Sequence, residues 1–239
     1  MPTAPEHRIQ AAEVQGKGPD SPTTPRREFE SSQLYGGIYE YVKQYMSRYD
    51  ASHDFNHVLR VLATAKHILA KEAAAHPATT YNSKAVILAA LLHDVGDRKY
   101  IQPGEQAEQL IESVLARNGC PPKFSAKVAL IVEHVSYSSE VKRPGLVKAI
   151  CGAHPELAIV QDADRLDSIG ALGIGRVFAY GAAKAPERGL RGSIDHFDEK
   201  LLKVEGMMKT ETGRALARKR TERLRMFKEW WAEEQMLEP

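Results

Sequence analysis

The feature that most constrains the fold is an unbroken run of apolar residues, 85–92, followed directly by His93 and Asp94. A helix that is hydrophobic on every side belongs in the interior of a domain. Burying a charged group there without a partner or a metal ion is strongly unfavourable. Because imidazole and carboxylate groups are common ligands of divalent first-row ions, a bound cation would satisfy both side chains. We therefore predict a buried helix, with Ser83 as its N-cap and Gly96 at its end, and a metal site beside it. An isolated His-Asp pair also occurs at ordinary helix ends, so the prediction depends on other residues.

Two further residues strengthen the prediction of a metal site. His57 lies upstream in a helical pattern, and Asp164 lies downstream, after a short apolar run. The order His, His-Asp, distant Asp resembles the signature of the HD-domain metal-dependent phosphohydrolase superfamily. The segments 52–61, 93–99, 162–170 and 196–202 look like the YpgQ/YedJ-like branch of nucleotide pyrophosphohydrolases, and the resemblance extends from about residue 39 to 230.

The resemblance implies a fold, a ligand set and a reaction. It implies an all-α protein, a single HD-domain helical bundle with the metal site in its core. The implied ligands of one divalent ion (Mn, Mg, Co, Ni or Fe) are His57, His93, Asp94 and Asp164. Such a ligand set leaves coordination positions open for water and a phosphate oxygen, as a catalytic site requires. The implied reaction is hydrolysis of a nucleoside triphosphate to monophosphate and pyrophosphate, and the broader expectation is metal-dependent hydrolysis of a phosphorylated small molecule.

Two acidic residues near these ligands are candidates for supporting roles in the reaction. Asp97 lies about one helical turn past His93, and we predict that it acts as general base or positions the water, with a salt bridge to Arg98 as the alternative. We expect Asp167 to orient Arg165 or His57, because ligating histidines usually donate their second nitrogen to an acceptor.

We predict that several histidine, arginine and lysine side chains bind the phosphate groups of the substrate. His53 precedes His57 by four residues, so both lie on one face if the helix begins early enough. His134 either forms a hydrogen bond at a helix end or contacts phosphate or a second metal. The complete set of predicted substrate-binding residues is His53, Arg98, Lys99, His134, Arg165, His196 and Lys200. Gly170, Gly173 and Gly175 with Arg176 do not have the spacing of a nucleotide-binding loop, and we discount them as such.

Composition limits the class of protein. The formal charge of +2 comes from nearly balanced acids and bases, so no overall field favours nucleic acid or an anionic membrane, and we expect no specific nucleic-acid binding. Two cysteines are too few for a disulfide framework. No apolar stretch has the length of a spanning helix, and the first thirty residues lack the core of a signal peptide. We therefore expect a cytoplasmic protein, with the nucleus not excluded, that binds no membrane.

Periodicity and composition predict the organisation of the chain. Residues 1–30, rich in Pro, Ser and Thr, are expected to form a disordered tail, and residues 31–239 the helical hydrolase domain. We expect that exposed helix faces of such a bundle allow a homodimer. Loops are predicted over 73–82 and 182–193, the latter either solvated or a mobile gate. Helices are predicted over 32–49, 53–71, 107–115, 124–137, 157–171, 196–207 and 211–234.

Two other functions stay open. A di-iron HD-domain oxygenase needs extra histidines between the His-Asp pair and the last Asp, and only His134 and His154 are available. A non-catalytic nucleotide-binding helical module would bind nucleotide without a metal. The oxygenase predicts two irons per chain, and the binding module predicts nucleotide affinity that a chelator does not change.

Overall fold

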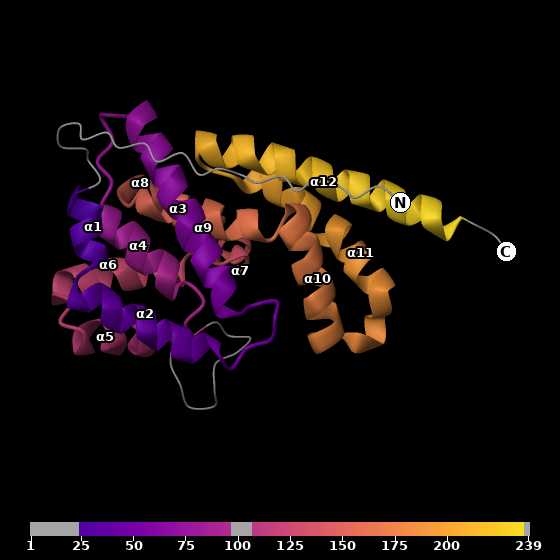
Figure 1. Ribbon diagram of the computed structural model, residues 1–239. Coiled ribbons are helices and arrows are strands. Elements are labelled where there is room, and N and C mark those ends of the chain that lie inside the picture. The colour runs from indigo at the N-terminus through magenta and orange to yellow at the C-terminus, as the bar shows by residue number, and fades with distance from the viewer. Residues whose placement is uncertain (1–23, 97–106, 237–239) are drawn as a thin grey trace, which may run out of the picture.

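The computed structural model describes residues 24–96 and 107–236, and within these ranges every regular element is a helix (Figure 1). The predicted all-α class is therefore confirmed. The α-helices are α1 (Thr24–Glu30), α2 (Gln33–Met46), α3 (Phe55–Ala75), α4 (Ser83–Leu92), α5 (Ala107–Arg117), α6 (Pro122–Glu133), α7 (Tyr137–Lys142), α8 (Pro144–Ala153), α9 (Glu156–Asp167), α10 (Gly170–Lys184), α11 (Gly189–Glu199) and α12 (Glu211–Gln235). Two 3-10 segments, η1 (Pro186–Arg188) and η2 (Leu201–Met207), flank α11. No described helix combines the length and the apolar character that crossing a membrane requires.

Helix α4 is the centre of the hydrophobic core. All eight apolar residues of the run 85–92 are fully buried, as the sequence predicts. The helix packs against α3, α6 and α9. The prediction of Ser83 as N-cap is wrong by one residue: Asn82 has the extended backbone of an N-cap, and its Oδ1 accepts a hydrogen bond from the backbone N–H of Ala85 at 3.1 Å. Gly96 ends the segment with φ of 77°, a conformation that favours glycine.

Helix α9 lies beside α3 and α4 and also contacts α12. It ends earlier than predicted, at Asp167, because Gly170 adopts φ of 75° and the chain changes direction into α10. In the middle of α9, Asp162 accepts hydrogen bonds from the backbone N–H groups of Lys209 and Thr210. This buried carboxylate therefore links α9 to the start of α12.

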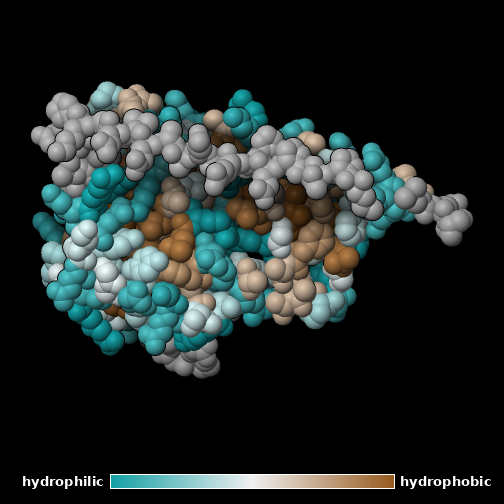
Figure 2. Space-filling view, in the orientation of Figure 1, coloured by the Kyte–Doolittle hydropathy of each residue, from teal (hydrophilic) through white to brown (hydrophobic). Residues whose placement is uncertain are grey.

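Helices α10 and α11 lie side by side and form a hairpin next to the rest of the bundle (Figure 1). The loop predicted over 182–193 is wrong, because only Ala185 and the 3-10 segment η1 separate α10 from α11, which begins at Gly189. Ile194 and Phe197 are buried, which stabilises α11 where its basic composition suggested a loop. Figure 2 shows hydrophobic surface over these two helices. Leu172 of α10 and Leu190 of α11 have exposed side chains.

The predicted tail overlaps the first helix. Its last seven residues form α1, in which Phe29 is buried. Oε1 of Glu30 forms an ion pair with Nζ of Lys66 at 2.9 Å. The ring of Phe29 also packs edge-on against that of Tyr35. Residues 1–23 lie outside the described residues, so the disordered tail remains a prediction for them.

Candidate metal centre

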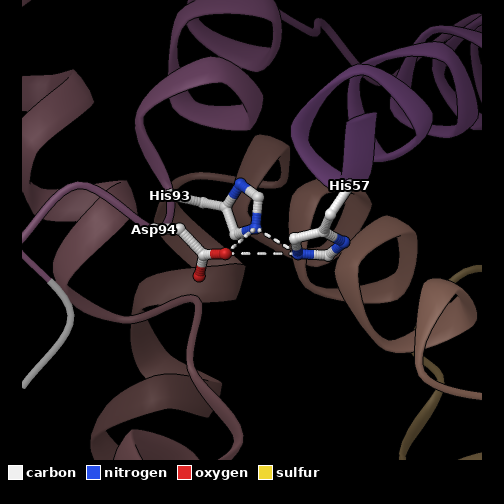
Figure 3. A group of neighbouring side chains, drawn as sticks. All are labelled: His57, His93 and Asp94. Carbon is white, nitrogen blue, oxygen red and sulfur yellow. Dashed lines mark hydrogen bonds and ion pairs between the residues drawn. The ribbon is translucent and has the colours of Figure 1, made fainter. Parts of the chain in front are cut away.

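Three side chains, one from the start of α3 and two from the residues just after α4, meet in the core (Figure 3). His57 lies in the first turn of α3, where Asp54 caps the helix by accepting the His57 backbone N–H at 3.0 Å. His93 and Asp94 follow α4 directly. The Nε2 atoms of the two imidazoles are 3.2 Å apart, and Oδ2 of Asp94 lies 3.2 Å from Nε2 of His57 and 3.5 Å from Nε2 of His93. These three atoms face one point between them.

The donor atoms fit a small divalent ion. Neighbouring ligands at bond lengths near 2.1 Å and right angles are about 3 Å apart, close to the distances found here. Oδ2 of Asp94 is buried and has no hydrogen-bond partner among the described residues, which is unfavourable unless a cation lies beside it. Burial raises the pKa of Asp94, but His93 and His57 lower it more, so its pKa lies well below the usual range. The carboxylate is therefore ionised and available as a ligand.

The second nitrogen of each imidazole fixes its orientation. Nδ1 of His57 lies 2.7 Å from Oδ2 of Asp167, and Nδ1 of His93 lies 2.9 Å from the carbonyl oxygen of Ala90. Both partners are acceptors, so each Nδ1 donates and each Nε2 presents its lone pair to the cluster. Burial lowers the pKa of His57, but its hydrogen bond with Asp167 and the nearby negative charge of Asp94 raise it overall. A positive charge among these carboxylates is therefore favoured.

Asp164 is the fourth predicted ligand. It lies on α9, and its Oδ1 is 3.6 Å from Nε2 of His57 and 3.7 Å from Nε2 of His93. The structure thus brings all four predicted metal ligands together. Among the described residues, only His57, His93 and Asp94 have ligand atoms that all lie within 4.8 Å of one another. Asp164 lies at the edge of this group.

Asp167 is buried behind His57 and accepts hydrogen bonds from two arginines. Arg60 donates from Nε at 2.8 Å and from Nη2 at 2.9 Å, and Arg176 donates from Nη1 at 3.1 Å. Burial raises the pKa of Asp167, but these donors and His57 lower it far below its usual range. Sequence reasoning did not single out Arg60, and it named Arg176 only as part of a glycine-containing segment that it discounted. Arg60 follows His57 by three residues on one helix face, which is a signal for a shared partner, whereas nothing local indicates Arg176.

A cleft with a volume of about 400 Å³ opens from the cluster. Its wall includes the predicted substrate residues His53, Arg165 and Lys200, together with Arg176. Nδ1 of His53 lies 2.7 Å from Oγ of Ser52. His53 precedes the start of α3, so it does not share a helix face with His57. Lys142, Arg143 and Asp164 also belong to the cleft wall.

Two of the predicted substrate residues in the cleft wall have defined protein partners. Arg165 donates to Oε2 of Glu140 at 2.7 Å and to the carbonyl oxygen of Met207 at 3.2 Å. Lys200 lies 4.7 Å from the centre of the Tyr137 ring, within the range of a cation–π contact. The cleft therefore combines cationic side chains and an aromatic ring beside the candidate metal centre.

Other predicted residues lie outside the cleft wall as described. His196 is near the end of α11, not at the start of a helix, and pairs with Glu199 at 3.1 Å. His134 is buried at the end of α6, where its Nδ1 lies 2.9 Å from the carbonyl oxygen of Leu130. Asp97, Arg98 and Lys99 lie outside the described residues. The structure does fix the chain before them, because the N–H of Gly96 donates to Oη of Tyr45 at 3.1 Å.

Comparisons with known proteins agree with this geometry. Residues 54–169, which include all four predicted ligands, match the HD domain family. Over 187 residues the chain is 33% identical to YpgQ of Bacillus subtilis (strain 168), covering 77% of this chain and 84% of the relative. The crystal structure of Bacillus subtilis YpgQ in complex with ADP is similar, with a TM-score of 0.65 and 28% identity over 82% of this chain and 97% of that chain. An HD-superfamily hydrolase from Bacillus thuringiensis gives a TM-score of 0.62 and 28% identity over 90% of this chain and 100% of that chain. The chain therefore belongs to the HD-domain superfamily of metal-dependent phosphohydrolases.

Proposed function

We propose that the protein hydrolyses a nucleoside triphosphate to the monophosphate and pyrophosphate, using one divalent ion held by His57, His93, Asp94 and Asp164. The observation that carries the proposal is the convergence of two imidazole Nε2 atoms on a buried Asp94 oxygen that has no hydrogen-bond partner in the described part of the chain. When bound, the ion supplies Lewis-acid activation of a phosphoryl group and lowers the pKa of water. The two Nδ1 contacts described above hold the imidazoles ready for it.

The cleft supports a nucleotide as substrate. Its volume of about 400 Å³ lies within the usual range for small-molecule sites. Arg165, Arg176, Lys142, Arg143 and Lys200 contribute cations to its wall, which suits a polyphosphate. The relative YpgQ has been crystallised with ADP, which supports a nucleotide rather than another phosphorylated molecule.

Several roles in this reaction remain proposals from sequence. We propose that Asp97 positions or deprotonates the attacking water, because it follows the ligand pair closely in the chain. Arg98 and Lys99 would add positive charge near the leaving group. His53 would contact a phosphate from the cleft wall, where the structure places it.

The experiment combines metal analysis with a nucleotide panel. Purified protein is expected to contain about one divalent ion per chain, and the loaded enzyme to release pyrophosphate from a nucleoside triphosphate. Asp94→Asn removes a ligand charge and is expected to abolish release, whereas Asp195→Asn, at a solvent-exposed side chain of α11, is the matched control. Metal-loaded protein that releases neither pyrophosphate nor phosphate from any nucleotide would contradict the proposal.

The same measurements separate the other functions. The oxygenase requires about two irons per chain and oxygen consumption. Among the described residues, the compact group of metal-binding side chains includes neither His134 nor His154. Release of phosphate without pyrophosphate would instead indicate attack at the terminal phosphorus.

A further inference from the structure

Arg176 belongs to α10, which contributes none of the four candidate metal ligands, yet its side chain is part of the cleft wall. Its Nε donates to the carbonyl oxygen of Ser52 at 2.6 Å, and its Nη1 donates to Oδ2 of Asp167 at 3.1 Å. The same Asp167 oxygen accepts Nδ1 of His57 at 2.7 Å. A single carboxylate oxygen therefore separates the Arg176 guanidinium from an imidazole of the metal centre.

The charges around Asp167 do not balance without a further anion. Asp167 is paired with the guanidinium groups of Arg60 and Arg176, and Arg60 alone already forms two hydrogen bonds with it. Asp54 adds a second negative charge beside Arg60, and Arg220 adds a third guanidinium that interacts electrostatically with Asp167, so the cations still outnumber the carboxylates. The carboxylates of Asp94 and Asp164 would be offset by the divalent ion itself. The positive charge of Arg176 is consequently surplus beside the metal centre.

The two arginines differ in what they face. Arg60 is not part of the cleft wall, and its side chain is 31% exposed, so its charge is partly solvated elsewhere. Arg176 is part of the cleft wall. Arg60 of α3 is thus the partner that neutralises Asp167, and Arg176 of α10 is the cation that faces the cleft.

The guanidinium of Arg176 is also fixed in place. Its two anchors lie on different parts of the chain, the buried Ser52 before α3 and the buried Asp167 at the end of α9. Its third nitrogen, Nη2, has no hydrogen-bond partner within residues 24–96 and 107–236. A planar guanidinium held by two of its nitrogens is well suited to bind a phosphate oxygen with the remaining donors, because little side-chain freedom is lost on binding.

We propose that Arg176 binds a phosphate group of the substrate beside the metal ion, so that α10 completes an anion site whose metal ligands come from α3, α4 and α9. This inference rests on the proposed function for the identity of the substrate, but the phosphate contact itself can be tested without turnover. It makes Arg176 a substrate-binding residue, whereas Arg60 only positions Asp167 and, through it, His57.

The test measures binding of inorganic tripolyphosphate to the Mn²⁺-loaded protein by calorimetry. Arg176→Gln is expected to weaken binding about 10- to 100-fold, the usual effect of losing a charge-assisted hydrogen bond. Arg176→Lys keeps the charge but not the planar fork, so its loss is expected to be smaller. Arg60→Gln is the matched control: it removes two of the hydrogen bonds to Asp167 where Arg176→Gln removes one.

A purely structural role for Arg176 predicts the opposite order, with the larger loss in Arg60→Gln. The inference is overturned if that order is found, if Arg176→Gln binds tripolyphosphate as tightly as the wild type, or if the wild type does not bind it. Mn²⁺ affinity without anion is expected to change less than about threefold in Arg176→Gln, which shows that the cluster is intact. Tripolyphosphate binding that depends on Arg176, in a protein that hydrolyses no nucleotide, would reject the proposed function and keep this inference.

Discussion

Replacing Asp167 by asparagine tests whether the carboxylate behind His57 supports metal binding. Oδ2 of Asp167 accepts from His57, Arg60 and Arg176, whereas Oδ1 accepts only from Nε of Arg60. The asparagine amide is therefore expected to place its oxygen at the Oδ2 position and its NH₂ group toward Arg60. The imidazole keeps an acceptor, but one without charge.

The size of the effect follows from these contacts. A hydrogen bond to a neutral acceptor is roughly half as strong as one to a carboxylate, and loss of an outer partner of a ligating histidine usually weakens metal binding about 10- to 100-fold. This corresponds to about 1.4–2.8 kcal/mol. Without metal, Nε of Arg60 loses its acceptor, which lowers the free energy of unfolding by about 1–3 kcal/mol.

The assay has two parts. Calorimetric titration with Mn²⁺ gives the metal affinity of wild type and Asp167→Asn, and urea unfolding in the presence of a chelator gives the stability of the metal-free forms. The control is Asp195→Asn. Its side chain is 46% exposed and pairs with Arg191 on the surface of α11, so both quantities are expected to stay within about 0.5 kcal/mol of wild type. Mn²⁺ affinity of Asp167→Asn within about twofold of the wild type would refute the reasoning about the imidazole.

Three other predictions concern the metal, the core and α10. Removing divalent ions with a chelator is expected to lower Tm in a thermal melt. An ion at about 100 times its Kd stabilises the folded state by about 2.7 kcal/mol, so a Tm that does not change when Mn²⁺ is added back would count against a metal centre. Leu88→Ala, in the fully buried run of α4, is expected to lower the free energy of unfolding in urea by about 2–5 kcal/mol, whereas Leu190→Ala, at a position 64% exposed, should change it by less than about 0.5 kcal/mol. A Cβ on Gly173 would lie 2.3 Å from the carbonyl oxygen of Ser168, whereas one on Gly175 meets nothing within 4 Å. Gly173→Ala should therefore lower Tm, and Gly175→Ala should stabilise the helix by up to about 1 kcal/mol; thermal melts showing the reverse order would contradict the packing described for α10.

The parts of the fold and site that could be predicted from the sequence are those with a local signal. The run 85–92 has no polar face, so its burial follows from composition alone, and the structure buries all of it. His57, His93, Asp94 and Asp164 were found because their types and order resemble a family signature, and the structure brings them together.

The parts that could not be predicted depend on pairs of residues distant in the sequence. From the sequence we expect Asp167 to orient Arg165 or His57, and only the fold shows that Arg165 pairs with Glu140 while Arg176 shares Asp167 with Arg60. The segment 182–193 was misjudged for a related reason. Its glycines and basic residues suggest a loop. Packing against α10 and η2 nevertheless stabilises α11, and such tertiary contacts cannot be predicted from the local sequence.

The short helix α9 has one further consequence for how this chain tolerates change. Within six positions it presents Asp162 to the start of α12, Asp164 to the metal cluster, Arg165 to Glu140 and Asp167 to His57. Inserting or deleting a single residue there would turn everything beyond it by about 100° around the helix axis and misdirect several of these groups at once. We therefore expect natural variants and engineered libraries to vary α9 by substitution on its remaining positions and to place changes of length in the connections that flank it.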